Sequence, residues 1–153
     1  MKLTVLGKYG PFPAPGGACS GYLLESNEAK LLIDCGSGVL SRLLSVTSLE
    51  SLDGILLSHL HSDHMSDMLI LRYAIQQFQA RGVHVPYPLF AAMPEEPEAE
   101  YKQLAMSGVY DITTITDKMK LKIKDLTITF TRVIHPVPTY AMRIQDDEKT
   151  FVY

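Results

Sequence analysis

The chain has 153 residues, which predicts one domain, and its 46% hydrophobic and 20% charged residues exclude a mostly disordered protein. Fourteen lysines and arginines against seventeen aspartates and glutamates give a net charge of −3, which disfavours attraction of the whole surface to nucleic acid or to an anionic membrane. The N-terminus lacks the apolar core of a signal peptide and no stretch reaches the length of a membrane span, so we predict a cytoplasmic protein without membrane contact.

The first two thirds of the chain are predicted to contain both strands and helices. Strands are predicted at residues 2–6, 20–25, 29–34, 54–59 and 87–91. Helices are predicted at residues 37–45, 64–80 and 95–107. The glycine- and proline-rich residues 7–17 form a loop. In the 64–80 helix, apolar side chains recur every three or four positions and predict one buried face, formed by Met68, Leu71, Ile75 and Phe78.

From Tyr110 onward the pattern is that of β-structure. Strands are predicted at residues 111–115, 119–123, 126–134, 139–144 and 150–153. Short polar segments at residues 124–125 and 145–148 are typical of hairpin turns. The second part of the chain is therefore expected to add antiparallel strands to the mixed structure before it.

The two cysteines, Cys19 and Cys35, lack the CxxC spacing of redox and zinc motifs and are too few for a disulfide framework. We predict two reduced, partly buried thiols. Among the five histidines, His84 falls in a predicted loop and is interpreted as a surface residue.

The segment Ser58–His64, with the sequence SHLHSDH, directly follows an apolar strand and directly precedes the long helix. In an extended backbone His59 and His61 point to the same side, and the turn into the helix redirects Asp63 and His64 towards a neighbouring point. Three imidazoles and one carboxylate suit Zn²⁺, Mn²⁺ or Fe²⁺. The alternative, a polar helix N-terminus capped by Ser62 or Asp63, does not explain three histidines in one place.

This HxHxDH pattern resembles the metal-binding signature of the metallo-β-lactamase superfamily. Three further segments are similar to that family in the expected order, namely LLIDCG (31–36), VIHPVPTYAMRI (133–144) and the opening GKYGPFPAPGGACSGYLLE (7–25), which looks most like the ribonuclease Z-like branch. The resemblance implies an α+β fold, the four-layer αββα sandwich, of which this chain would supply the N-terminal half and the first strands of the second half.

The resemblance also implies a ligand set for two Zn²⁺ ions, with Mn²⁺ or Fe²⁺ as alternatives. His59, His61 and His135 would hold one ion, and Asp63 and His64 the second. Asp63 would be the catalytic residue, because it would also orient the metal-bound hydroxide. Asp34 would touch neither ion and would accept a hydrogen bond that fixes a ligand. By their sequence context alone, Asp34 is also compatible with a cap after a strand and His135 with an ordinary histidine at a strand end.

The family pattern continues beyond a strand such as 150–153 with a bridging Asp and, later, a further histidine. We therefore expect a single domain over residues 1–153 that is truncated at its C-terminus, with too few ligands for the second ion. An incomplete sheet would leave an unpaired edge, which predicts homo-oligomers through that edge.

The resemblance implies a metal-dependent hydrolase, and we predict a phosphodiesterase that acts on a small phosphodiester or nucleotide through the metal-bound hydroxide. The acidic net charge disfavours a large nucleic-acid substrate, so the expected partner is a small molecule. Two alternatives remain, an ester, lactone or thioester hydrolase of the same superfamily, and a catalytically incomplete metal-binding fragment. No residue of the chain is identified as the general acid.

Overall fold

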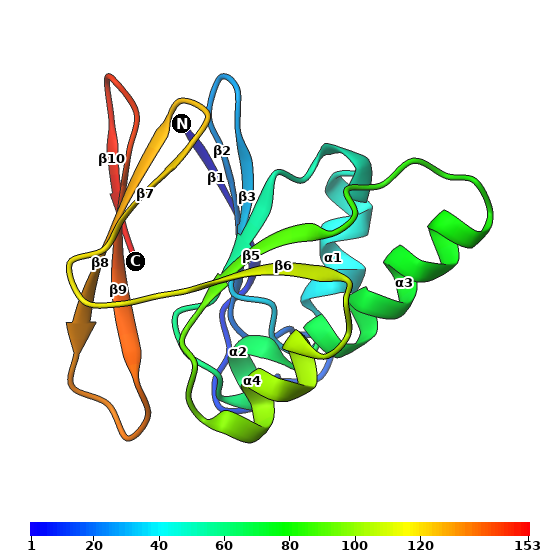
Figure 1. The fold of residues 1–153 in the computed structure, drawn as a ribbon, viewed down its shortest axis with the longest axis horizontal. Coiled ribbons are helices and arrows are strands. Elements are labelled where there is room, and N and C mark those ends of the chain that lie inside the picture. The colour runs from blue at the N-terminus through cyan, green and yellow to red at the C-terminus, as the bar shows by residue number, and fades with distance from the viewer.

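Two β-sheets face each other, and the helices cover the outer face of the larger one (Figure 1). The structure is a computed structural model that describes all residues, 1–153. The chain therefore forms three layers in the order helices, larger sheet, smaller sheet. No helix of this chain covers the outer face of the smaller sheet, which agrees with the predicted N-terminal half and first strands of an αββα sandwich.

The larger sheet has six strands in sequence order and the smaller sheet has four. The six strands are β1 (Lys2–Gly7), β2 (Gly21–Glu25), β3 (Lys30–Ile33), β4 (Gly54–Leu56), β5 (Leu89–Met93) and β6 (Tyr110–Thr114). The pairs from β1 to β3 are antiparallel, and those from β3 to β6 are parallel. The smaller sheet is antiparallel in the order β10–β9–β8–β7, with β7 (Lys120–Ile123), β8 (Leu126–Val133), β9 (Thr139–Gln145) and β10 (Thr150–Val152).

Four helices connect the parallel strands or lead into them. They are α1 (Val39–Val46), α2 (Ser62–Met65), α3 (Met68–Ala80) and α4 (Glu98–Ala105), with a single 3₁₀ turn at Leu49–Ser51. The predicted buried face of α3 is confirmed, since Met68, Leu71 and Ile75 are fully buried and Phe78 packs against the same core. Every helix falls short of the length and apolar character that crossing a lipid bilayer requires.

The alternation of side chains along the central strands divides the interior into two cores. In and just after β4, Ile55 and Leu57 pack against the helices, whereas Leu56 packs against the smaller sheet. The first core has 24 buried residues and the second has 13, with Phe130 of β8 the largest fully buried side chain. Apart from Lys30 at the start of β3, the residues of β3, β4 and β5 form continuous apolar runs, which is typical of strands buried on both faces.

All ten predicted strands are confirmed, with shifts of a few residues at their ends. The predicted strand 54–59 is shorter, because the chain leaves the sheet after Leu56 to form the loop that carries the histidines. The predicted helix 95–107 begins only at Glu98, where Pro97 precedes it in an extended conformation. Both cysteines are free as predicted, but they are completely rather than partly buried.

The predicted helix 64–80 was wrong in one respect, because it is divided at Ser66 and Asp67 into α2 and α3. The N–H of Asp67 donates to the carbonyl of Cys35, at 3.0 Å, instead of completing the helical ladder. Its carboxylate accepts the N–H of Leu40, at 2.9 Å, and so supplies the cap that the first turn of α1 lacks. Through these two hydrogen bonds, Asp67 connects the loop after β3 and the start of α1 to the segment between α2 and α3.

Gly36 lies at the point where the loop after β3 touches α2. We expect a side chain at this position to destabilise the fold. A Cβ at this position would lie 1.9 Å from the carbonyl oxygen of Asp63, so a side chain cannot be added without moving the backbone. We expect Gly36→Ala to lower the free energy of unfolding by about 1–3 kcal/mol, measured by urea denaturation. Ser37→Ala, at the exposed neighbouring position, is the control. Equal midpoints for the two variants would contradict the close approach.

Candidate metal centre

The candidate site lies where the chain leaves the carboxyl ends of β3 and β4, the edge of a parallel sheet at which such folds bind ligands. His59 follows β4, and His61 directly precedes the first turn of α2. His135 comes from the smaller sheet, in the loop between β8 and β9. The two sheets therefore each contribute to one site, although His61 and His135 are 74 positions apart in the chain.

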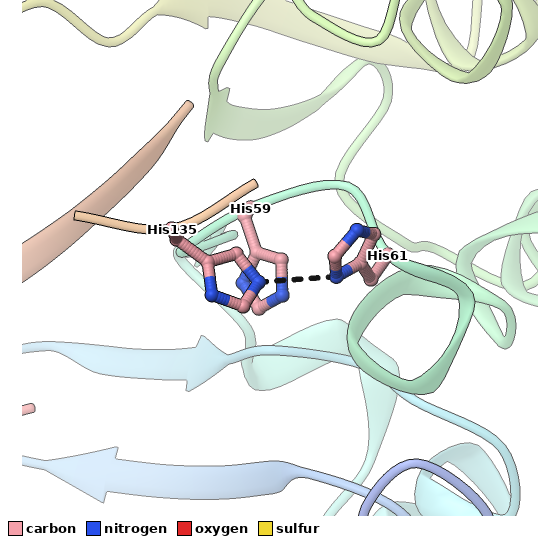
Figure 2. A group of neighbouring side chains, drawn as sticks. All are labelled: His59, His61 and His135. Carbon is pink, nitrogen blue, oxygen red and sulfur yellow. Dashed lines mark hydrogen bonds between the residues drawn. The ribbon is translucent and has the colours of Figure 1, made fainter. Parts of the chain in front are cut away.

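Figure 2 shows that the imidazole rings of His59, His61 and His135 converge on a common point. One nitrogen from each ring lies within 4.8 Å of the others. Nε2 of His135 and Nδ1 of His61 are 3.2 Å apart, close to the roughly 3.4 Å that separates two nitrogens on one tetrahedral zinc ion. The geometry therefore suits a three-nitrogen site for a divalent cation.

His64 and Asp63 lie beside this cluster but do not belong to it. The ring of His64 is 4.0 Å from that of His59, measured between centroids. Nε2 of His64 and a carboxylate oxygen of Asp63 are 3.5 Å apart, so these two side chains face each other. The chain thus brings two donors, and not three, to the place predicted for the second ion.

Asp34, at the end of β3, is a fully buried carboxylate beneath the histidines. One oxygen accepts the backbone N–H of Ser58 at 2.7 Å. The other oxygen has three partners, Ser58 Oγ at 2.8 Å, His64 Nδ1 at 2.6 Å and the hydroxyl of Tyr153 at 2.7 Å. Asp34 has the left-handed φ of 54°, which is sparsely populated for a residue with a side chain. The four hydrogen bonds to its carboxylate hold Asp34 in this conformation.

These hydrogen bonds determine which nitrogens face the site. An ionised carboxylate only accepts, so His64 donates from Nδ1 to Asp34. The hydroxyl proton of Ser58 is also directed at Asp34, so Ser58 Oγ accepts from Nδ1 of His59, 3.0 Å away. Both rings then keep the lone pair of Nε2 for a cation. One buried carboxylate thus sets the tautomers of two histidines, as ligand-supporting groups in metal sites do.

The two rings differ in their electrostatic environment. Burial, and next the neighbouring ring of His64, lower the pKa of His59 to about 4, so its neutral form is available at neutral pH. Burial opposes a charge on His64 too, but the hydrogen bond to Asp34 and the charges of Asp34 and Asp63 outweigh it and raise the pKa of His64. The surroundings of His64 therefore favour the protonated form of its ring in the metal-free chain.

The proline-rich loop 8–17 borders the site next to Asp63. A Cβ on Gly10 would lie 3.0 Å from a carboxylate oxygen of Asp63, so the loop backbone packs directly against this candidate ligand. Arg42 of α1 attaches both ends of the loop, because its guanidinium donates to the carbonyls of Leu6, at 3.1 Å, and of Gly16. The loop is thus anchored in place as one wall of the site.

Comparison with known proteins establishes the family. Residues 29–153 match the family model described as "Beta-lactamase superfamily domain". Over 158 residues the chain is 41% identical to the probable metallo-hydrolase YhfI of Bacillus subtilis, an alignment that covers 100% of this chain and 62% of the relative. The chain belongs to the metallo-β-lactamase superfamily. It spans about three-fifths of the length of this relative.

Three solved structures share the fold of this chain. The crystal structure of YhfI from Bacillus subtilis superposes with a TM-score of 0.92 at 38% identity, over 99% of this chain and 61% of that one. Human tRNase Z, short form, gives a TM-score of 0.72 at 16% identity, over 99% of this chain and 68% of that one. A diphosphatase from the PhnP family gives 0.70 at 17% identity, over 93% and 61%. The last two likenesses concern the fold alone.

Membership of this superfamily implies a divalent metal ion, and the donor set fits one. His59, His61 and His135 supply three nitrogens that are already gathered around one point, and imidazole nitrogen is a common zinc ligand. Which of the candidate residues bind metal remains a prediction, for these three as well as for Asp63, His64 and the supporting Asp34.

The sequence reasoning missed two residues of this site, Ser58 and Tyr153. Ser58 precedes the first histidine directly, and a hydroxyl next to a candidate ligand was a signal that could have been followed. Tyr153 gave no such signal, because only the pairing of the smaller sheet brings it to Asp34. His84 is exposed, as predicted, and is not part of the cluster.

Proposed function

We propose that this chain forms the metal-binding part of a hydrolase that cleaves a small phosphodiester or nucleotide. The observation that carries the proposal is the convergence of His59, His61 and His135 from two sheets on one point. The name of the 41% identical relative, probable metallo-hydrolase YhfI, supports hydrolysis. The names tRNase and diphosphatase belong to two neighbours that this chain resembles in fold, and both denote cleavage of a bond to phosphorus, so this substrate class is the first to test.

The side chains divide the expected chemistry between them. A divalent ion held by the three histidines would lower the pKa of a water molecule and offset the negative charge that develops on the phosphoryl oxygens. Asp63 and His64 would face the reacting groups from the side of α2, where the carboxylate of Asp63 can accept a hydrogen bond from the attacking water. Asp34 and Ser58 keep the rings of His59 and His64 oriented for this role.

A small substrate fits the charge of this chain better than a structured RNA. Binding of an RNA backbone depends on lysines and arginines that neutralise phosphates, whereas the net charge here is −3. The wall next to Asp63 is a short loop tied to α1 and offers no extended basic arm. A small diester or nucleotide needs few such contacts beyond the metal centre itself.

The substrate class predicts an order of rates. With added Zn²⁺ or Mn²⁺, we expect this chain to hydrolyse bis(p-nitrophenyl) phosphate faster than a lactone or a thioester by at least about tenfold in kcat/KM, equivalent to ~1.4 kcal/mol in the barrier. The measurement is absorbance at matched substrate concentrations, with His61→Ala as the blank for free metal. A faster lactone or thioester reaction would instead favour the carboxylic-ester branch of the superfamily.

A second candidate function follows from the two donors found where the second ion is predicted. With only Asp63 and His64 at that place, the chain would bind one metal ion, at the three-histidine site, and turn over no substrate. Calorimetric titration with Zn²⁺ separates the candidates, because a single bound ion together with no detectable diester hydrolysis favours the metal-binding fragment. Two tightly bound ions per chain would contradict it.

A further inference from the structure

Tyr153 lies outside the histidine cluster, yet its hydroxyl reaches the carboxylate that orients the rings. We propose that Tyr153 is a positioning residue for the metal centre, whose hydrogen bond to Asp34 fixes the carboxylate and through it the rings of His59 and His64. The proposal rests on the metal-binding part of the proposed function and is independent of the substrate.

The backbone of Tyr153 is held firmly in the smaller sheet. Its N–H donates to the carbonyl of Met142 at 2.9 Å, and its carbonyl accepts the N–H of Met142 at the same distance. This pair extends the ladder in which Phe151 and Val152 of β10 pair with Ile144 and Arg143 of β9. The phenol ring packs against Tyr22 of β2, with 5.3 Å between ring centroids. The hydroxyl therefore projects from a rigid support.

Asp34 needs such a support because its own side chain does not fix the plane of the carboxylate. The terminal torsion of an aspartate is soft, so the orientation is decided by its hydrogen bonds. The oxygen that binds His64 is otherwise contacted by Ser58 Oγ, and both partners belong to the loop that is being positioned. Tyr153 is the donor that reaches this oxygen from the opposite sheet.

The link has a consequence for the whole site. His135 is carried by the loop between β8 and β9, and Tyr153 pairs with β9 in the same sheet. The hydrogen bond to Asp34 therefore ties the sheet that supplies His135 to the carboxylate that orients His59 and His64. Loss of this bond releases the orientation of the rings, whereas the cores between the layers are unchanged.

Tyr153→Phe removes the hydroxyl and keeps the ring. A cavity of about 290 Å³ lined by Ser58, His59, His64 and Tyr153 among others lets water replace the lost donor, but such a water is not tied to the sheet. We expect zinc affinity to fall about tenfold or more, which is typical when a group supporting a metal ligand is removed. Tyr22→Phe is the matched control, since it removes a hydroxyl from the other ring of the same pair, one without a hydrogen bond to Asp34.

Two readouts separate positioning from a merely structural role. Zinc affinity is measured by competition with a chromophoric chelator, and the ¹⁵N signals of the imidazoles are recorded in the metal-free chain. At a pH at which both rings are neutral, we expect His59 and His64 to hold their proton on Nδ1 in the wild type and in Tyr22→Phe, and to show mixed tautomers in Tyr153→Phe. Equal zinc affinities and unchanged ¹⁵N signals in the two variants would overturn the proposal.

A measurement on the wild type covers the case in which Tyr153→Phe does not fold. The hydroxyl proton of Tyr153 is expected to exchange slowly and to show a nuclear Overhauser effect to the Nδ1 proton of His64. A rapidly exchanging hydroxyl without this contact would overturn the proposal. None of these readouts involves hydrolysis, so failure of the proposed function leaves them interpretable. If the chain binds no zinc, the proposed metal centre is contradicted, and the ¹⁵N signals alone then test the role of Tyr153.

Discussion

His61→Ala is expected to lower the affinity for Zn²⁺ about 100-fold and to abolish metal-dependent hydrolysis. A structural zinc site with four ligands contributes ~10–16 kcal/mol in total, so one ligand is worth ~3 kcal/mol, or about two powers of ten in affinity. His61 directly precedes α2 and contacts His135 across the two sheets, so its removal opens the cluster on the side of the helix. The measurement is a zinc titration by calorimetry.

The matched control for His61→Ala is His84→Ala. His84 is an exposed histidine in the loop after α3, remote from the cluster, so zinc affinity and hydrolysis should equal those of the wild type. A comparable loss of affinity in both variants would mean that the chain binds zinc through scattered surface histidines. Retention of full affinity by His61→Ala would exclude the three-histidine centre.

Asp34→Asn is expected to destabilise the metal-free chain by about 3 kcal/mol and to weaken metal binding as well. Four donors converge on the buried carboxylate of Asp34. An amide presents its own N–H groups to part of this set and leaves at least one buried donor without an acceptor, which costs ~1–3 kcal/mol, and more where a charged group was involved. The measurement is urea denaturation in the presence of a chelator, which separates folding from metal binding.

The control for Asp34→Asn is Asp117→Asn, a change of the same chemistry at an exposed position. Asp117 accepts a backbone hydrogen bond from Arg132 at 2.9 Å, which an asparagine oxygen can also accept, so the free energy of unfolding should change by less than about 0.5 kcal/mol. Similar losses in both variants would show that the buried network around Asp34 adds nothing specific to stability.

Much of the fold was predictable because its signals are local. The apolar run Leu31–Ile33 and the three-to-four spacing in α3 reflect the periods of a strand and a helix, and both elements form where they were predicted. The break at Asp67 was not predictable in this way. It depends on a hydrogen bond to Cys35, which comes from a different part of the chain.

The candidate site was likewise predictable only where its residues are neighbours in the sequence. His59 and His61 lie two positions apart after a strand, so the sequence alone brings them to one place, and the spacing to Asp63 and His64 belongs to the same short segment. The position of Ser58 was readable from the same segment, but its hydrogen bonds to Asp34 and His59 were not.

The order of the elements and the cluster of potential ligands after β4 can be read from local sequence, because both depend on neighbouring residues and on the periods of strands and helices. The resemblance implied His135 as a ligand, and the packing of the two sheets is what brings its ring to the cluster. The same packing places the hydroxyl of Tyr153 at Asp34. These contacts cannot be read from local sequence, because the smaller sheet packs on the larger one through apolar side chains, and apolar contacts are non-directional. That packing places two distant loops and one strand end around a single buried carboxylate.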